Sequence, residues 1–171
     1  MNNFVASFYK ISFENFKNFL SSINTIENYD IKNIYDNIVI PKRATKFSAG
    51  YDFFSPFDFI LNPKETILIP TGIRCKMNKD VVLLLFPRSS LGFKYRLQLD
   101  NTIGVIDSDY YDSKNEGHIV IKLTNDSNDN ILSLKSKEAI CQGIFLNYLL
   151  AQEEEVVNIR DGGIGSTNEK K

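Results

Sequence analysis

Four short segments carry polar side chains in patterns that could do chemistry, and the most informative one places a carboxylate close to an aromatic ring. In residues 101–110, NTIGVIDSDY, Asp107 and Tyr110 would point to opposite faces of a straight strand. Because Asn101 and Gly104 favour tight turns, we expect a bent hairpin that brings both side chains to one ligand. An ionised carboxylate in such a place could act as a general base beside a stacked nucleobase.

A second segment, residues 87–92 (PRSSLG), directly follows the most apolar run of the chain. Arg88 offers planar donors, Ser89 and Ser90 offer short hydroxyl donors, and the loop backbone adds N–H groups. Together these groups suit an oxyanion such as phosphate. A polar turn at the mouth of a barrel would use the same residues, so the segment alone leaves both interpretations open.

Two further segments combine glycines with polar side chains. Residues 49–52 (AGYD) place Asp52 after a glycine turn, a pattern also found where an aspartate only caps its own backbone. Residues 160–167 (RDGGIGST) combine glycines, which allow close approach to a ligand, with hydroxyls and an arginine. No lysine follows the last glycine, so this is not a Walker A loop, and a flexible tail is the alternative interpretation.

The chain is poor in the residue types on which most zinc sites and many catalytic sites depend. It contains one histidine, His118, and two cysteines, Cys75 and Cys141. A structural zinc site needs about four Cys or His ligands, so none can be built within one subunit, and we expect reduced, buried thiols. His118 lies in an alternating apolar run, which predicts a strand residue near a sheet edge. Enzyme chemistry would therefore use a carboxylate with water, phosphate-binding groups and, if needed, a hard metal ion.

Composition and charge exclude several functional classes. Of the 171 residues, 43% are apolar and 24% are charged, which is sufficient for a folded core. The balance of 20 basic against 21 acidic residues provides no global positive field for nucleic acid or an anionic membrane. Apolar runs such as 81–86 are far shorter than the roughly 20 residues that cross a bilayer, and the N-terminus lacks a basic lead segment. We expect a soluble, cytoplasmic protein that binds neither nucleic acid nor membranes.

The elements that must position these segments change in kind at Pro41. Before it, apolar residues recur at spacings of three and four between Phe13 and Ile23, which predicts an amphipathic helix with Ser12 as its N-cap. A shorter helical stretch is expected around residues 30–35. The apolar stripe could pack on the body of this chain, on a sister subunit or on a partner protein.

After Pro41 the pattern changes to short β segments separated by turn residues. The predicted segments are 66–69, 72–76, 81–86, 118–123 and 139–149. No helical period of useful length recurs, so the body is predicted to be an all-β sandwich or barrel. We divide the chain into a helical N-terminal extension (1–36), a β domain (37–150) and a glycine-rich C-terminal segment (151–171).

The order and spacing of the four segments, with residues 139–142 (AICQ) as a fifth, resemble the motifs of the trimeric dUTP pyrophosphatases (dUTPases) over about residues 38–168. The resemblance implies a distorted β-barrel or jelly-roll sandwich. It also implies hydrolysis of dUTP to dUMP and pyrophosphate by attack of water on the α-phosphorus, which lowers dUTP and supplies dUMP for thymidylate synthesis. Family sites form between subunits, so a homotrimer is implied.

The resemblance leaves two alternatives open. The dCTP deaminases resemble the same fold, although residues 104–107 followed by Tyr110, together with the glycine-rich tail, favour pyrophosphate release over ammonia release. The helical start and an apparent insertion at residues 111–115 resemble a bacterial and phage-encoded subgroup, so a dUTPase that also acts as a regulatory protein-binding factor is the other alternative. We expect the insertion to be an exposed loop, with a subgroup-specific contact as the alternative.

The resemblance assigns a role to each matching residue. Asp107 would orient and deprotonate the attacking water, and Tyr110 would pack under the deoxyribose and exclude a 2′-hydroxyl. Asp52 would hold Mg²⁺ through coordinated water. The uracil edge would be read by Asn101 and by the backbone of Gly104, Val105 and Ile106.

The remaining matches lie on the phosphate side of the implied substrate and in the tail. The triphosphate would be held by Arg88, Ser89, Ser90 and Gln142. The tail would form a lid through Arg160, Ile164, Gly165, Ser166 and Thr167. Family lids have a phenylalanine where this chain has Ile164, so we expect either weaker uracil binding, by roughly 1 kcal/mol of aromatic stacking, or a neighbouring aromatic residue that takes over the stacking.

Overall fold

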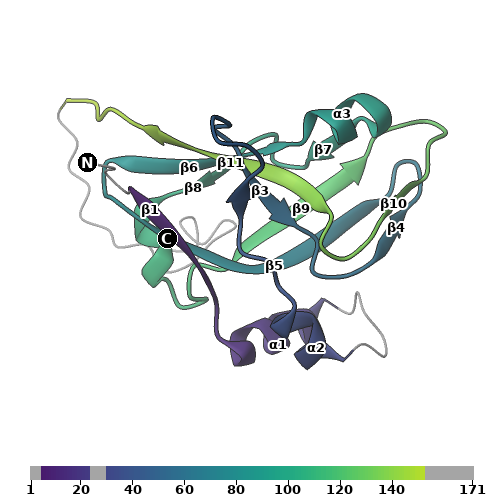
Figure 1. Cartoon of the computed structure of the whole chain (residues 1–171), viewed down its shortest axis with the longest axis horizontal. Coiled ribbons are helices and arrows are strands. Elements are labelled where there is room, and N and C mark those ends of the chain that lie inside the picture. Colours follow the sequence, from purple (N-terminus) through teal and green to yellow (C-terminus); the bar gives the residue numbers. More distant parts are fainter. Residues whose placement is uncertain (1–4, 24–29, 153–171) are drawn as a thin grey trace, which may run out of the picture.

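The structure is a computed structural model that describes residues 5–23 and 30–152 (Figure 1). Strands are the main secondary structure of the described chain and form three antiparallel sheets, which do not close into a barrel. The two larger sheets lie in two layers, with β6, β8 and β11 above β5 and β9 in Figure 1. The prediction of a mostly β fold is therefore confirmed, in its sandwich form.

The first sheet has four strands in the order β1-β5-β9-β7. Its members are β1 (Ala6–Lys10), β5 (Thr66–Met77), β9 (Ile119–Asn125) and β7 (Leu97–Leu99). The sequence predicted two separate segments where β5 is one continuous strand. The break in the pattern is a shift in register between Pro70 and Ile73, where Gly72 has a φ of 69°.

The second sheet has five strands in the order β2-β3-β11-β6-β8, and a two-stranded sheet pairs β10 with β4. The five strands are β2 (Lys42–Arg43), β3 (Tyr51–Phe54), β11 (Ala139–Asn147), β6 (Val81–Pro87) and β8 (Gly104–Ile106). The two others are β10 (Leu132–Leu134) and β4 (Phe59–Leu61).

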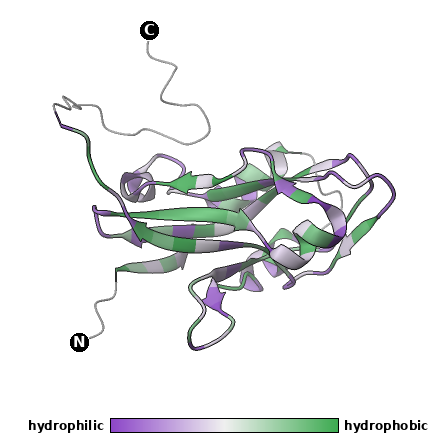
Figure 2. Ribbon diagram, turned by 90° about the horizontal axis from the view of Figure 1, so that it is seen from above, coloured by the Kyte–Doolittle hydropathy of each residue, from purple (hydrophilic) through white to green (hydrophobic). Residues whose placement is uncertain are grey.

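The core lies between the layers because the central strands alternate buried and less buried positions. Ile119, Ile121 and Leu123 of β9 are almost completely buried, and so are Leu83 and Leu85 of β6. This alternation places one face of each strand inside the sandwich. Figure 2, coloured by hydropathy, shows the apolar residues concentrated along the strands and the polar ones in the connecting loops.

Two helices precede the β domain and lie beside β5 (Figure 1). They are α1 (Phe13–Ser22) and α2 (Ile31–Asp36). Ser12 caps α1, because its Oγ accepts a hydrogen bond from the Asn15 N–H at 3.2 Å, and Asp30 caps α2 in the same way. Both predicted helices are confirmed. Within the described residues, no helix is long and apolar enough to cross a membrane.

The apolar stripe of α1 packs on the body of its own chain. Phe16 and Leu20 are buried in the same core cluster as the strands, together with Ile38. A Cβ added at Gly72 of β5 would lie 3.3 Å from the Phe16 ring, so helix and sheet are in direct contact. Of the three surfaces considered for this stripe, the structure shows the chain's own body. The boundaries at residues 36 and 150 stay a prediction.

Two short helices in the β domain were not predicted. They are α3 (Ser89–Tyr95) and the 3₁₀ helix η1 (Ser108–Asp112). In α3 only Leu91 is buried, so no apolar stripe marks it in the sequence. It ends at Arg96, whose φ of 50° is left-handed. The segment after Arg88, for which a polar turn was one of the two interpretations, is therefore the first turn of a helix.

The buried ring of Phe16 should be essential for stability. We expect Phe16→Ala to lower the free energy of unfolding by about 3–5 kcal/mol, because it leaves a cavity between α1 and β5. Phe47→Ala is the matched control, since Phe47 is 89% exposed. Urea denaturation measures both. Equal midpoints for the two variants would contradict this packing.

Candidate active site

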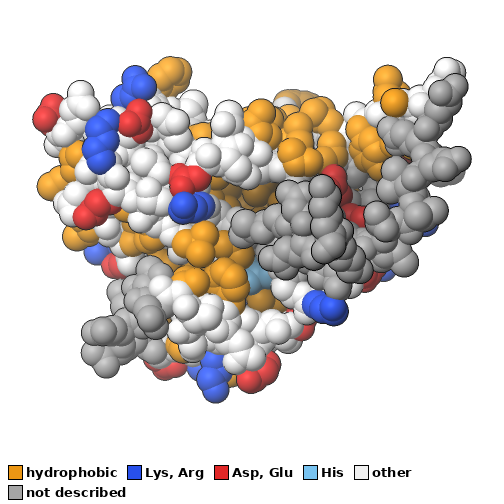
Figure 3. Space-filling model, turned by 180° about the vertical axis from the view of Figure 1, so that it is seen from behind, with side chains coloured by type: hydrophobic (Ala, Val, Ile, Leu, Met, Phe, Trp, Pro, Cys, Tyr) orange, Lys and Arg blue, Asp and Glu red, His pale blue; other side chains and the backbone are white. Residues whose placement is uncertain are grey.

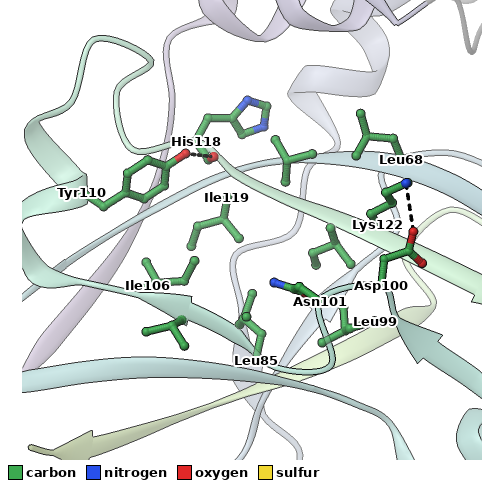
Figure 4. A pocket seen from close by; sticks show the side chains of 14 residues that line it. Leu68, Leu85, Leu99, Asp100, Asn101, Ile106, Tyr110, His118, Ile119 and Lys122 are labelled. Carbon is green, nitrogen blue, oxygen red and sulfur yellow. Dashed lines mark hydrogen bonds and ion pairs between the residues drawn. The ribbon is translucent and has the colours of Figure 1, made fainter. Parts of the chain in front are cut away.

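A cavity of about 680 Å³ opens between the two larger sheets. Leu68 of β5 and Ile119 of β9 line it on one side, and Leu85 of β6 and Ile106 of β8 on the other (Figure 4). On the face seen in Figure 3, hydrophobic side chains gather in the hollow next to the single histidine of the chain. The walls are thus mostly apolar, and a few polar groups converge on them.

The turn at residues 100–103 forms one end of the cavity. The Thr102 N–H donates to the Leu99 carbonyl at 2.8 Å, and Thr102 has a φ of 66°. The strands on either side of the turn belong to different sheets, because β7 pairs with β9 whereas β8 pairs with β6. The predicted two-stranded hairpin is therefore wrong. The turn instead carries the chain from one layer to the other, and Asn101 lines the cavity there.

The chain bends again after β8, as the sequence predicted. β8 ends at Ile106, Asp107 is half-buried, and the Tyr110 N–H donates to the Asp107 carbonyl at 3.2 Å as η1 begins. Gly104 allows β8 to approach β6 closely, since a Cβ there would lie 3.1 Å from Leu85 Cβ. Tyr110 thereby joins Gly104, Val105 and Ile106 in the cavity wall, and Asp107 lies between these lining residues in the chain.

The Tyr110 side chain is fixed in this wall. It is 7% exposed, and its hydroxyl donates to the His118 carbonyl at 2.8 Å (Figure 4). The same hydroxyl accepts a hydrogen bond from Asn115 Nδ2 at 2.7 Å. The segment 111–115 is only partly the exposed loop that the sequence predicted, because Asp112 and Lys114 alone are exposed. Ser113 is buried, and its Oγ donates to the Tyr110 carbonyl at 2.7 Å. The polar side chains of Ser113 and Asn115 thus form internal hydrogen bonds.

His118 also differs from its predicted place at a sheet edge. It is 2% exposed and directly precedes β9, which lies between β5 and β7. Its Nε2 accepts a hydrogen bond from the Gly72 N–H at 3.0 Å, which requires the unprotonated nitrogen. Burial lowers the pKa of His118 to about 4, against the opposing effect of Glu116. His118 is therefore a neutral structural acceptor at pH 7.

Three of the sequence-predicted segments meet at one end of the second sheet. Asp52 of β3 pairs with Gln142 of β11, and Arg88 Nε lies 3.4 Å from Asp52 Oδ1. A glycine is needed at position 50, because a Cβ on that residue would lie 2.6 Å from Oε1 of Gln142. We call these three residues the Asp52–Arg88–Gln142 cluster.

Ser89 and Ser90 open α3 directly after this cluster. The first turn of a helix leaves backbone N–H groups without partners inside the helix, and those groups favour anions. The cluster and the two serines therefore offer a guanidinium, an amide, two hydroxyls and backbone donors in one place. This is a donor set for a phosphate chain.

Within one chain, this donor set and Asp107 lie at opposite ends of β6. Leu83 pairs with Ile106, which precedes Asp107, whereas Pro87, which precedes Arg88, pairs with Cys141. Arg88 lies five positions beyond Leu83, so the two ends are separated by roughly 17 Å at 3.3 Å per residue. A substrate bound by both residues of a single chain would have to extend along most of β6.

The described residues contain no group of three or more His, Cys, Asp or Glu side chains that could hold a metal ion by itself. Asp52 is one carboxylate, and it is paired with Arg88. Such a donor set fits Mg²⁺ that keeps most of its waters and binds through substrate phosphates.

The predicted site residues of the tail lie outside the described residues. They are Arg160, Ile164, Gly165, Ser166 and Thr167. Two polar residues that the sequence analysis did not select, Asp100 and Lys122, also line the cavity and form an ion pair of 3.0 Å at its rim (Figure 4). The position of Asp100 directly before Asn101 in the turn was the signal that could have found it.

Comparisons with known proteins identify the family of the chain. The family model described as dUTPase matches residues 36–169. The deoxyuridine 5′-triphosphate nucleotidohydrolase of Lactococcus lactis subsp. lactis (strain IL1403) is 38% identical over 147 residues, which span 83% of this chain and 97% of the relative.

Solved structures give the same result. The crystal structure of dUTPase from Streptococcus mutans superposes with a TM-score of 0.63 and 32% identity, covering 85% of this chain and 98% of that chain. A mutant dUTPase from phage phi11 of S. aureus, whose structure addresses the coordination of a structural Mg(II) ion, has a TM-score of 0.59 and 20% identity. The superposition covers 74% of this chain and 94% of the phage chain. At this identity the similarity shows a shared fold and nothing more.

The neutral state of buried His118 predicts a specific pH dependence of stability. Its pKa is about 4 when folded and about 6.5 when unfolded, so the unfolded chain binds the additional proton between these values. The stabilisation of the folded state that neutral His118 provides is complete above pH 6.5 and is lost as the pH falls toward 4. Between pH 7 and pH 5 we expect a loss of about 2 kcal/mol of unfolding free energy.

His118→Gln is the matched control, because its amide oxygen can accept the Gly72 N–H without titrating. Urea denaturation of both proteins at pH 7 and pH 5 gives the difference. An identical pH dependence of the two proteins would show that His118 is not held neutral.

Proposed function

Because the chain belongs to the dUTPase family, it is an enzyme that hydrolyses dUTP to dUMP and pyrophosphate, and we propose how its own residues carry out this reaction. The observation that carries the proposal is the cavity whose wall is built from Asn101, Gly104–Ile106 and the fixed ring of Tyr110. These are the residues that the family resemblance assigns to the nucleoside. The proposal assigns this cavity to the deoxyuridine part of the substrate.

Recognition of uracil would depend on the backbone at β8. Uracil presents one N–H between two carbonyl oxygens, and Asn101 with the N–H and C=O groups of Gly104–Ile106 can complement that pattern. Cytosine presents a different pattern and would leave buried polar groups unpaired, which costs more than a mismatch in shape. The close approach of β8 to β6 at Gly104 supports a narrow site that excludes the methyl group of thymine. Tyr110 would lie against the deoxyribose and leave no room for a 2′-hydroxyl.

Asp107 would activate the water. It follows β8 directly and is half-buried, so its carboxylate can reach a water held at the end of the nucleoside cavity. The water oxygen forms a bond to the α-phosphorus, its proton passes to the carboxylate, and the bond from this phosphorus to the bridging oxygen breaks to release pyrophosphate. A carboxylate is an adequate base at neutral pH when the water is already held in line.

The triphosphate would be held by the Asp52–Arg88–Gln142 cluster with Ser89 and Ser90. Arg88 would bind phosphate oxygens with its planar guanidinium, and its ion pair with Asp52 keeps that group oriented. Asp52 would also hold Mg²⁺ through coordinated water. The ion, when bound, would neutralise charge on the phosphate oxygens.

The separation along β6 supports active sites shared between subunits. Asp107 and Arg88 of one chain lie toward opposite ends of β6, which favours a complete site that combines the nucleoside cavity of one subunit with the phosphate donors of another. We propose a homotrimer that forms such sites, with the tail residues 160–167 as a lid. Ile164 would then cover the base without aromatic stacking.

The proposed partner set is dUTP and further copies of this chain. A cytoplasmic location and the absence of nucleic acid and membrane partners stay predictions. A regulatory protein-binding role also stays a prediction, and the burial of the apolar stripe of α1 in its own chain gives it no support.

The catalytic role of Asp107 is tested by Asp107→Asn. The wild-type protein should release pyrophosphate from dUTP with Mg²⁺ and no ammonia from dCTP. Asp107→Asn should lower turnover by roughly two to four orders of magnitude and leave dUTP binding nearly unchanged, because only proton transfer is lost. Asp109→Asn, at an exposed position of η1, is the matched control and should keep normal turnover. Near-normal turnover of Asp107→Asn would remove Asp107 from the mechanism.

Shared sites predict complementation between two inactive variants. Asp107→Asn disables one half of a site and Arg88→Gln disables the other. When equal amounts are unfolded and refolded together, about a quarter of the sites should receive two intact halves and recover activity, as expected for random assembly of a closed ring. Each variant refolded alone is the control. A mixture no more active than the two separate variants would show that each chain forms its own site.

A further inference from the structure

Glu116 joins two segments that are 104 positions apart in the chain. Its Oε2 accepts the Ser12 N–H at 2.7 Å, its Oε1 accepts the Ser12 hydroxyl at 2.7 Å, and Asn15 Nδ2 also donates to it. All three donors belong to the start of α1, where the helix dipole favours a negative charge. Partial burial alone would raise the pKa of Glu116, but these hydrogen bonds and Arg74 lower it overall, so the carboxylate is charged.

Arg74 of β5 contacts both Tyr111 and Glu116, the first and last residues of segment 111–116. Its Nη2 donates to the Tyr111 carbonyl at 2.6 Å, and its guanidinium lies 3.7 Å from the centre of the Tyr111 ring. Its Nη1 lies 3.9 Å from Glu116 Oε2. Tyr9, which pairs with Arg74 across β1 and β5, packs its ring against Tyr111 at 6.1 Å. Strands β1 and β5 therefore both contact segment 111–116, β1 through Tyr9 and β5 through Arg74.

The inner side of this segment surrounds Tyr110. We call residues 111–117 the Tyr110 loop. Asn115 donates to the Tyr110 hydroxyl, Ser113 donates to the Tyr110 carbonyl, and a Cβ added at Gly117 would lie 2.7 Å from that carbonyl oxygen. Glu116 itself has a φ of 58°, which residues other than glycine rarely adopt. The side-chain contacts of Glu116 must therefore compensate for an unfavourable backbone conformation.

A second chain of hydrogen bonds reaches Tyr110 from the neighbouring residue Ile11. The Ile11 N–H donates to the Gly72 carbonyl at 3.0 Å, and the Gly72 N–H donates to His118 Nε2 at 3.0 Å. The His118 carbonyl in turn accepts the Tyr110 hydroxyl. Both routes to Tyr110 begin at the residues that start α1, so the N-terminal segment and the wall of the nucleoside cavity form one hydrogen-bonded unit.

From these contacts we infer that Glu116 is a positioning residue, which fastens the Tyr110 loop to the start of α1 and so fixes the Tyr110 ring in the cavity wall. The inference rests on the proposed role of Tyr110 beside the deoxyribose. Neither Glu116 nor Ser12 lines the cavity. The N-terminal segment would thereby contribute to sugar selectivity through the Tyr110 loop, without touching the substrate.

The steady-state constants of Glu116→Ala test this inference. We expect the KM for dUTP to rise roughly tenfold while kcat changes less than about threefold, because a loosened wall weakens binding more than water activation. The preference for dUTP over UTP should fall as well, since the ring that excludes the 2′-hydroxyl gains freedom. Glu116→Gln keeps one acceptor for the Ser12 N–H and should restore most of the wild-type KM. Unchanged KM and selectivity in Glu116→Ala would overturn the inference.

Glu65→Ala is the matched control. Its carboxylate likewise accepts a backbone N–H, that of Asn62 at 2.8 Å, but it caps a turn that makes no hydrogen bond to the Tyr110 loop. This variant should keep the wild-type KM and selectivity. Equal losses in Glu65→Ala and Glu116→Ala would mean a general loss of stability, and would also overturn the inference.

Ser12→Ala tests the coupling from its other end and serves if Glu116→Ala fails to fold. It should raise KM in the same direction, and the double variant should be no worse than Glu116→Ala alone, because both changes break one connection. Additive effects of the two changes would contradict the coupling.

Hydrogen exchange of the amides at residues 110–118 provides a readout that needs no substrate. Exchange should be faster in Glu116→Ala and Ser12→Ala than in the wild type and Glu65→Ala. Unchanged exchange in both variants would refute the positioning role even if dUTP is hydrolysed. Absence of dUTP hydrolysis by the wild-type protein would instead refute the proposed function.

Discussion

The pairing of β6 with its two neighbours is the constraint on which the rest of the site depends. β6 pairs with β8 on one side and β11 on the other, and this register places Asp107 near one end of the strand and Arg88 at the other. A strand cannot shorten this distance, because its rise per residue is fixed by backbone geometry. On this basis we propose that the chain carries two half-sites, one for the nucleoside and one for the phosphates.

Each half-site depends on close backbone contacts and on side chains fixed by neighbours. Gly104 lets β8 approach β6, and Gly50 makes room for the Gln142 amide. Tyr110 is held through its hydroxyl, and Arg88 through its ion pair with Asp52. Because these groups are oriented before substrate binds, less of the binding free energy is needed to order them. A two-layer sandwich with connections between its sheets can provide such fixed positions at its open edges.

Part of this arrangement was predictable from the sequence. The helix after Ser12 was predictable because its apolar stripe and N-cap are local signals, and the longer strands were predictable from alternation. The spatial neighbours of each strand and helix were not predictable from the sequence. Periodicity did not show that β7 and β8 belong to different sheets, and α3 was missed because only Leu91 is buried. The polar Tyr110 loop was expected in solvent because composition does not show which polar groups satisfy one another.

The central claim is that the nucleoside half-site and the phosphate half-site of one active site come from different chains. A crystal structure with Mg²⁺ and a non-hydrolysable dUTP analogue tests it most directly. The account predicts the base and sugar between Asn101 and Tyr110 of one subunit, with the phosphates of the same molecule held by Arg88 of another. A single nucleotide bound by Tyr110 and Arg88 of the same chain would contradict it.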